Sequence, residues 1–508
     1  MTHREDRKRQ QRDREIKIAE DMISGKVPYI PYERKKKTAQ GNRKGGGTNT
    51  DGGNDEMASR AIGLLRLILP AITTKMSDIY DPRNPKKIIH SVGALMSYGI
   101  LMFLCYVSSR REANRRLGSE ETHARLLEAL PELATMPHAD TLKRLLSNTH
   151  VEDIKNNYEA IIIEFIKSTA FRSMNKGRYM IVIDGSGKFM RRYNWDPHAL
   201  RRSSDEPGKD TYYAYMLDSV LIMENGMTIP LLTEPVANNI EGNGDDKQDC
   251  ELRAFHRLAD RLAAIFGKGQ VTLLLDGIYA NGPVMTKCKN NGWDYMTVLK
   301  SDSLKSIWDD FYGLCKAEPS NNFKTMYGDR TQVYNWANGI EYIYGKNNHK
   351  ISLNLVTCHE FWEEAKPRSG GVPEKKDTCY AWLSNEKLNT GNVFTRCNNI
   401  GRARWWIESS FNVEKNQGYY YGHCFSYDWD AMMGFHYLMK LAHFINVLLT
   451  HNENLIEYVV LEGYQGLIKK LWDIVIQRGV KKDIVCPKRR GRPKEIGAID
   501  YLLLCSSA

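Results

Sequence analysis

Two short apolar runs, each closed by an Asp-Gly pair, constrain the fold of this chain more than any other sequence feature. RYMIVID ends at Asp184 and QVTLLLD ends at Asp276. Runs of this length that are rich in Val, Ile and Leu are typical of buried strands. Because ligands bind outside the carboxyl ends of parallel strands, both Asp residues are placed to take part in a site. Capping of a turn or helix is an equally open interpretation for either Asp alone.

The sequence around these runs predicts an α/β fold. Residues 213–236 form two strand-like runs around Asn225-Gly226, a typical hairpin turn, and residues 249–266 have helical spacing. A helix near residues 282–290 and a strand, DYMTVLK, follow Asp276. The order strand, hairpin, helix, strand, helix, strand indicates a sheet with helices packed on its faces.

The regions on either side of this α/β segment have different sequence patterns. Residues 58–172 have apolar positions at helical spacing, so we expect a helical, DNA-binding domain there. Its most apolar stretch, residues 88–107, includes polar side chains and two Gly, which favours a buried helix over a membrane span. Residues 301–398 contain short β-like pieces and polar turns, which predict an inserted, mostly β subdomain. Residues 428–475 look helical again.

A helix is also predicted for RARWWIESSFNVEK, with Gly418 as its stop signal. Arg404, Glu408 and Lys415 fall on one face of this helix, with the first two one turn apart. The simplest interpretation is a surface salt bridge plus an unrelated Lys. However, the helix also carries two Trp, so it must pack, and packing restricts the freedom of Glu408.

Taken together, these residues resemble the DDE transposases of bacterial insertion sequences, in the branch with a β insertion before the catalytic Glu. That branch has the signature Tyr, two residues, Arg, three residues, Glu, six residues, Lys. Arg404, Glu408 and Lys415 match it, whereas Gly401 stands where the family has Tyr. The long interval between Asp276 and Glu408 leaves room for the insertion. The resemblance covers about residues 178–450.

The resemblance implies a ribonuclease-H-like mixed sheet flanked by helices, of the retroviral-integrase superfamily. Its core would comprise residues 173–300 and 399–450, followed by a C-terminal helical segment at residues 451–480. Asp184, Asp276 and Glu408 are implied to be catalytic and to hold two Mg²⁺ or Mn²⁺ ions, which prefer oxygen ligands. The resemblance also implies that Arg404 and Lys415 bind DNA phosphates and that Trp382, in WLSN, takes part in base flipping.

The net charge of +11 lies at the two ends of the chain. Residues 1–44 hold 14 Lys or Arg and seven Asp or Glu, and residues 481–494 hold seven Lys or Arg and one Asp. We therefore expect a disordered basic tail and linker over residues 1–57 and a basic tail over residues 481–508. Such tails suit a polyanion, because neutralised phosphates release counterions, although an anionic membrane surface would attract them too.

Two basic motifs point toward DNA. PKRRGRPKE, with Arg490 and Arg492, is similar to an AT-hook, which inserts into the narrow minor groove of A/T-rich DNA. A plain basic tail or a nuclear-localisation-like run explains it equally well. Arg111 and Arg115 lie one helical turn apart in SSRREANRRL and could grip a DNA backbone. A solvated helix face is at least as good an interpretation.

The implied partners are double-stranded DNA, namely the element's terminal inverted repeats and target DNA, and a second copy of the chain in a homodimer on DNA, with no membrane. Ten Cys without a CxxC pair and a polar start favour reduced thiols in a cytosol. We therefore expect a cytoplasmic, nucleoid-associated prokaryotic protein. Two alternatives stay open: an inactive DNA-binding protein of transposase descent, and another ribonuclease-H-like DNA nuclease.

Overall fold

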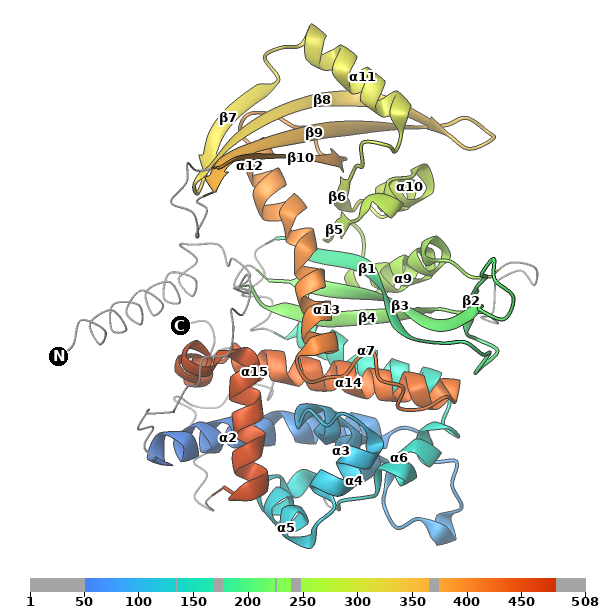
Figure 1. The fold of residues 1–508 in the computed structure, drawn as a ribbon, viewed down its shortest axis with the longest axis vertical. Helices are drawn as coiled ribbons and strands as arrows, with labels where there is room; N and C mark the ends of the chain where they lie inside the picture. The colour runs from blue at the N-terminus through green and yellow to red at the C-terminus, as the bar shows by residue number, and fades with distance from the viewer. Residues whose placement is uncertain are drawn as a thin grey trace, which may run out of the picture.

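The protein is described by a computed structural model over residues 51–133, 135–168, 177–223, 226–238, 248–364 and 374–480. It has a helical layer at one end and a single ten-stranded mixed sheet at the other (Figure 1). The predicted α/β class is confirmed. Most of the two predicted tails, including Arg490 and Arg492, lies outside the described residues.

The helical layer combines the beginning and the end of the described chain. Ser91, Ser109 and Ser119 cap three of its helices, because each side chain accepts a hydrogen bond from an N–H of the first turn. The elements of this layer are α2 (Asp51–Ser77), η1 (Pro85–Lys87), α3 (Val92–Leu104), α4 (Arg110–Leu117), α5 (Glu120–Ala129), η2 (Pro131–Leu133), α6 (Ala139–Leu146), α7 (Val151–Lys167), α14 (Trp429–Thr450) and α15 (Glu453–Gln477).

The first helix begins earlier than predicted. α2 starts at Asp51, inside the segment expected to be a linker. α2 is also the one described helix long and apolar enough to cross a membrane by length and composition, but 56% of its apolar window is buried and it packs against α3 and α15. α3, the predicted buried helix, is buried throughout.

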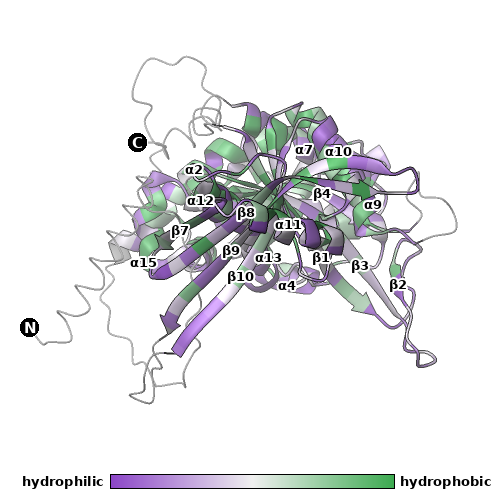
Figure 2. Ribbon diagram, turned by 90° about the horizontal axis from the view of Figure 1, so that it is seen from above, coloured by the Kyte–Doolittle hydropathy of each residue, from purple (hydrophilic) through white to green (hydrophobic). Residues whose placement is uncertain are grey.

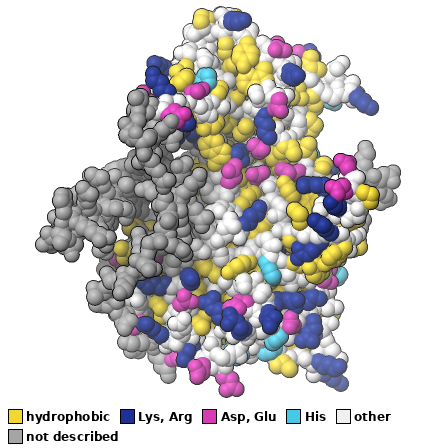
Figure 3. All heavy atoms as spheres, in the orientation of Figure 1, with side chains coloured by type: hydrophobic (Ala, Val, Ile, Leu, Met, Phe, Trp, Pro, Cys, Tyr) yellow, Lys and Arg dark blue, Asp and Glu magenta, His cyan; other side chains and the backbone are white. Residues whose placement is uncertain are grey.

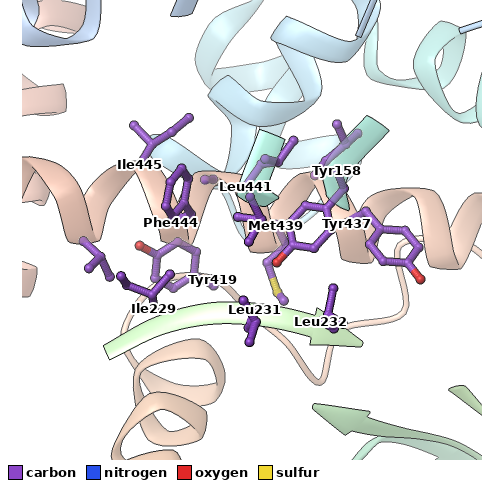
Figure 4. Close-up of a cluster of buried hydrophobic side chains, with 14 of the residues drawn as sticks. Tyr158, Ile229, Leu231, Leu232, Tyr419, Tyr437, Met439, Leu441, Phe444 and Ile445 are labelled. Carbon is purple, nitrogen blue, oxygen red and sulfur yellow. The ribbon is translucent and has the colours of Figure 1, made fainter. Parts of the chain in front are cut away.

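The long helix α14 joins the helical layer to the sheet. Almost all of its residues are buried, because it lies between α3 and α7 on one side and strand β4 (Thr228–Val236) on the other. Figure 4 shows this packing, with α14 side chains reaching β4 below and Tyr158 of α7 beside them. Side chains of the helical layer and of the sheet belong to one buried cluster, so the two parts share one core. Each fully buried apolar side chain in it stabilises the fold by about 1.5–3 kcal/mol.

The central sheet has the strand order β4-β3-β1-β5-β6. The middle strand, β1, is antiparallel to β3, which is antiparallel to β4, while β5 is parallel to both β1 and β6. The predicted strands and hairpin pairing are thus confirmed, as are the connecting helices. The remaining bounds are β1 (Tyr179–Arg191), β2 (Leu200–Arg202), β3 (Thr211–Ile222), α9 (Glu251–Phe266), β5 (Val271–Leu275), η3 (Gly277–Tyr279), α10 (Gly282–Asn290) and β6 (Asp294–Val298).

The predicted β insertion extends this sheet instead of forming a separate one. Its last strand pairs antiparallel with β6, with Trp382 opposite Val298. The ends of β9 and β10 remote from that pairing are hydrophilic (Figure 2). The insertion consists of α11 (Lys305–Ala317), β7 (Asn322–Tyr327), β8 (Arg330–Tyr344), β9 (His349–Glu364) and β10 (Glu374–Ser384).

The segment after β10 is less regular than the predicted single helix. It runs through α12 (Val393–Thr395), a π turn, η4 (Arg396–Ile400), and a 3-10 turn, η5 (Gly401–Trp405), before α13 (Trp406–Asn416). The buried Arg396 guanidinium donates to Asp294 at the start of β6, which ties these turns to the sheet. α13 stops shortly before Gly418, whose φ of +116° suits glycine.

Candidate active site

Asp184 and Asp276 lie beside each other where the parallel pairing of β1 with β5 stops. Asp276 directly follows β5, but the prediction that a strand ends at Asp184 is wrong, because β1 continues to Arg191 along its antiparallel pairing with β3. The ladder pairs Ile183 of β1 with Leu275 of β5, and each Asp is the next residue. Their side chains are 24% and 31% exposed, so both are open to a ligand. The sequence-based expectation that these two acids share one edge of the sheet is met by this pairing.

Asp184 is a carboxylate with weak compensation. Its Oδ1 accepts a hydrogen bond of 2.8 Å from the Gly185 N–H, and since Gly185 is also part of β1, this bond caps neither a turn nor a helix. Burial raises its pKa to about 6, and the charges of Glu251 and Asp276 add to this rise, while the Gly185 N–H and Arg404 oppose it. A positive charge placed here would relieve the repulsion between the acids.

Asp276 does not act as a helix cap. It occupies the N-cap position of η3, but its side chain makes no capping hydrogen bond. Its Oδ2 lies 3.9 Å from Nζ of Lys300, which follows β6 and is 57% exposed. The capping alternative therefore does not account for this residue, and its carboxylate is left with one loose ion pair.

Arg404 connects the third acid to the first. Its Nη2 donates to Glu408 Oε1 at 2.8 Å, and its Nη1 lies 3.8 Å from Asp184 Oδ2. The salt bridge that was the simplest alternative does form, but it forms next to Asp184. Within the described ranges, no three or more His, Cys, Asp or Glu side chains are arranged to hold a metal ion. In this structure the Arg404 guanidinium therefore links Glu408 to Asp184.

A buried charge network holds α13 against the sheet. Lys440 of α14 donates to Asp218 of β3 at 2.9 Å and to both oxygens of Glu414 of α13 at 2.8 and 3.0 Å. His443 Nδ1 lies 2.8 Å from Glu414 Oε1. Burial alone would raise the pKa of Asp218, but Lys440 and His436 lower it strongly. Because Glu414 and Glu408 both belong to α13, this network anchors the helix that carries Glu408.

Trp382 packs inside the protein and not at the surface. Its side chain is 2% exposed and stacks on Tyr380, with 5.7 Å between ring centroids. A Cβ at Gly401 would meet the Trp382 indole at 3.0 Å. The position at which the resembled family carries Tyr is therefore filled by this indole.

A cavity of about 990 Å³ lies between the insertion, the end of β6 and η5, and two residues of its lining, Lys300 and Arg404, contact Asp276 and Asp184. Its walls are rich in aromatic side chains from three elements, and Lys300 and Arg404 stand at the side of the acids. Trp382 forms part of the wall, whereas Tyr312 is 55% exposed. The lining includes Leu299, Lys300, Asp302, Trp308, Tyr312, His359, Tyr380, Trp382, Gly401, Arg404 and Trp405.

Sequence reasoning missed a fourth carboxylate, Glu251, at the start of α9. Tyr215 and Tyr279 donate to its two oxygens at 2.8 and 2.6 Å, and its charge contributes to the raised pKa of Asp184. Gly185 has no side chain to obstruct Tyr215, whose Oη would lie 2.2 Å from a Cβ there. An acid in a first helical turn is common, so no sequence signal distinguished Glu251.

The remaining predicted residues lie elsewhere. Lys415 is exposed on α13, with Nζ 5.6 Å from the centroid of the Tyr421 ring. Arg111 is exposed on α4, and Arg115 pairs with Glu112 at 2.7 Å. Asp and Glu side chains gather near the middle of the face in Figure 3, and Lys and Arg gather on its lower half.

The eight described cysteines are free, as expected for reduced thiols. Comparisons with known protein families and with curated proteins found no match to this sequence.

Proposed function

We propose that this chain is a DDE transposase that cuts and joins DNA in a divalent-metal-dependent reaction on a ribonuclease-H-like core. The observation that carries the proposal is that Asp184 and Asp276 are neighbours where the parallel β1–β5 pairing stops, while Arg404 links Glu408 of a later helix to Asp184. Two acids 92 positions apart are thus neighbours in the sheet, and the third is tied to one of them through a guanidinium.

The strand topology supports the same conclusion. A central strand with an antiparallel hairpin on one side and two parallel strands on the other is the arrangement expected of a ribonuclease-H-like sheet. The helix that carries the third acid follows an insertion added at the β6 edge. Function still depends on the site, because one fold hosts many activities.

The residues fit the implied metal ions. Asp184, Asp276 and Glu408 offer hard oxygen ligands, and the raised pKa of Asp184 reflects an excess of negative charge and burial that a cation would relieve. When bound, a pair of Mg²⁺ or Mn²⁺ ions would activate a water or 3′-hydroxyl and stabilise the departing oxygen. Glu408 must then leave Arg404, whose guanidinium is free to neutralise a backbone phosphate.

DNA contacts follow from the surroundings of the acids. Lys415 lies exposed along α13, where it suits a phosphate. The aromatic cavity suits an unstacked base, and Trp382 would shape its wall instead of stacking on that base as a mobile ring. We further propose that terminal repeats and target DNA are the substrates, bound by a homodimer on the nucleoid, with Arg490 and Arg492 as a minor-groove contact.

The test uses purified full-length protein and duplexes that carry the DNA flanking its own gene. We expect Mg²⁺-dependent strand cleavage at the element ends, lost in Asp276→Asn and Glu408→Gln and retained in Asp310→Asn, an exposed acid on α11 outside the cavity lining. DNA binding without cleavage by the wild type would favour the inactive DNA-binding alternative. Cleavage of branched DNA without preference for element ends would favour a different nuclease.

A further inference from the structure

An exposed group of aromatic rings and arginines lies where β1 ends. Tyr193 and Tyr427 are 55% and 45% exposed, with ring centroids 6.3 Å apart. The Arg191 guanidinium lies 5.4 Å from the Tyr427 ring, and its Nε donates to the Tyr427 hydroxyl at 2.9 Å. We call Arg110, Arg191, Arg192, Tyr193 and Tyr427 the basic-aromatic patch.

Cations from separate segments converge beside this patch. Burial lowers the pKa of His423, and the charges of Lys188, Arg191 and Arg110 lower it further. Lys188 and Arg191 belong to β1, whereas Arg110 begins α4, more than 70 positions earlier along the chain. Like charges brought together repel one another, and an anion bound among them would remove that cost.

Compensating acids are scarce at the patch. Neither residues 185–193 nor residues 418–427 contain an Asp or Glu. Arg191 has no ion pair with any residue that the structure describes, and Arg110 pairs with Asp140. The next acids along the chain are already engaged, since Asp196 bonds to His198 and Asp428 caps α14. The Arg191 guanidinium is therefore stacked and oriented, with Nε donating to Tyr427 and Nη1 to the Met190 carbonyl at 2.7 Å, and its Nη2 is the nitrogen left for a ligand.

The patch continues a line of cations from the candidate active site. The exposed Lys415 lies over the Tyr421 ring, with Nζ 5.6 Å from its centroid. Lys188, three residues before Arg191 on β1, lies under the surface, where its Nζ is 4.5 Å from the same ring and donates to the Tyr421 carbonyl. Beyond Arg110, α4 presents the exposed Arg111. The Lys and Arg side chains on the lower half of the face in Figure 3 agree with such a line.

We propose that the basic-aromatic patch binds the backbone of duplex DNA between the end held at the acids and the part held by the helical layer. This inference rests on the proposed function, because it names the surface that the same substrate would follow. A stacked arginine suits phosphate, to which it can donate two parallel hydrogen bonds. The exposed tyrosine rings would pack against deoxyribose, and their hydroxyls would face phosphate oxygens.

The experiment measures binding of a labelled duplex of about 30 base pairs to the full chain by fluorescence anisotropy, at several salt concentrations and without divalent metal. We expect Arg191→Gln/Arg192→Gln to bind about tenfold more weakly or worse, and to reduce the slope of log K against log salt by about two. Arg191→Lys/Arg192→Lys should keep most of the slope, because it keeps the charge. Lys350→Gln, at the far edge of the insertion, is the matched control and should bind like the wild type.

Unchanged affinity and slope in the Gln variant would overturn the inference, as would tighter binding of single strands than of duplex. The melting temperature of each variant should equal or exceed that of the wild type, so lost binding cannot be attributed to unfolding. The binding assay does not depend on cleavage, which the separate experiment above measures. A wild type that binds duplex through the patch but cleaves no DNA there would refute the proposed function and leave this inference standing. A wild type that does not bind duplex would refute both.

Discussion

Asp184 and Asp218 face each other across the β1–β3 ladder, yet they have opposite surroundings. Asp218 is 1% exposed and fully paired, with Lys440 at 2.9 Å and Thr233 donating to it, and its pKa is lowered. Asp184 is 24% exposed, 3.8 Å from its nearest cation, and its pKa is raised to about 6. Asp218 is thus part of a buried ion pair, whereas Asp184, its partner across the ladder, keeps a carboxylate that is open to a ligand.

The partners of a carboxylate therefore distinguish a structural acid from a candidate site acid within one sheet. A buried carboxylate with complete partners stabilises the arrangement of helices around it, and removing a partner leaves an uncompensated charge. A partly buried carboxylate with incomplete partners does not contribute to stability at neutral pH, so its presence calls for another reason. Each prediction below alters one member of the Asp184 and Asp218 pair or its partners.

The largest expected effect is on catalysis. Asp184→Asn should lower the rate of strand cleavage by about a thousandfold or more, because a lost metal ligand removes several kcal/mol of transition-state stabilisation. Asp218→Asn should retain cleavage in the fraction that stays folded. Single-turnover cleavage assays, corrected for the folded fraction by circular dichroism, measure both. Equal losses in the two variants would remove the distinction between the acids.

The next effect is on stability. Lys440→Met should lower the free energy of unfolding by about 3–5 kcal/mol, because it leaves Asp218 and Glu414 buried without their cation. Urea unfolding followed by tryptophan fluorescence measures it. Lys470→Met, which removes a surface pairing with Glu462, is the control and should change stability by at most about 1 kcal/mol.

Restoring neutrality tests the cause of that loss. Asp218→Asn/Lys440→Met/Glu414→Gln carries no charge at the three positions and should recover most of the stability that Lys440→Met loses. If the triple variant is as unstable as Lys440→Met alone, packing around the Lys440 side chain, and not charge, explains the loss.

A smaller effect is the pH dependence of stability. The folded protein holds the Asp184 proton more tightly than the unfolded chain, since the pKa is about 6 instead of 3.8. This group therefore stabilises the fold at acidic pH, and the contribution is lost as pH rises through 6. Wild type should lose stability relative to Asp184→Asn between about pH 4 and 7. A constant difference over that range, measured by urea unfolding, would show that burial does not shift the Asp184 pKa.

The sequence identified Asp184 as a candidate site residue but gave no indication of Asp218. Asp184 and Asp276 could be found because each closes a short apolar run, and such a run can be recognised from neighbouring residues alone. Glu408 needed the spacing to Arg404 and Lys415. Asp218 carried no signal, because its cationic partner Lys440 lies in α14, 222 residues away.

The same limit explains the other differences between prediction and structure. The joining of the insertion to β6 is a long-range pairing that spacing within a strand does not encode. The irregular turns before α13 depend on Trp382 packing over Gly401 and on Arg396 reaching Asp294. Glu251 lies in a first helical turn like many acids, and only its two tyrosine donors distinguish it.

The smallest predicted effect tests the metal directly. At neutral pH, Mg²⁺ should raise the melting temperature of the wild type by about 1–4 °C, since an ion that binds only the folded protein stabilises it. Asp184→Asn should lose this increase, whereas Asp310→Asn should keep it. Because protons compete for the same carboxylate, the increase should shrink as pH falls below 6. An increase of the same size in Asp184→Asn would mean that Mg²⁺ binds elsewhere, and the contrast between Asp184 and Asp218 would then concern burial alone.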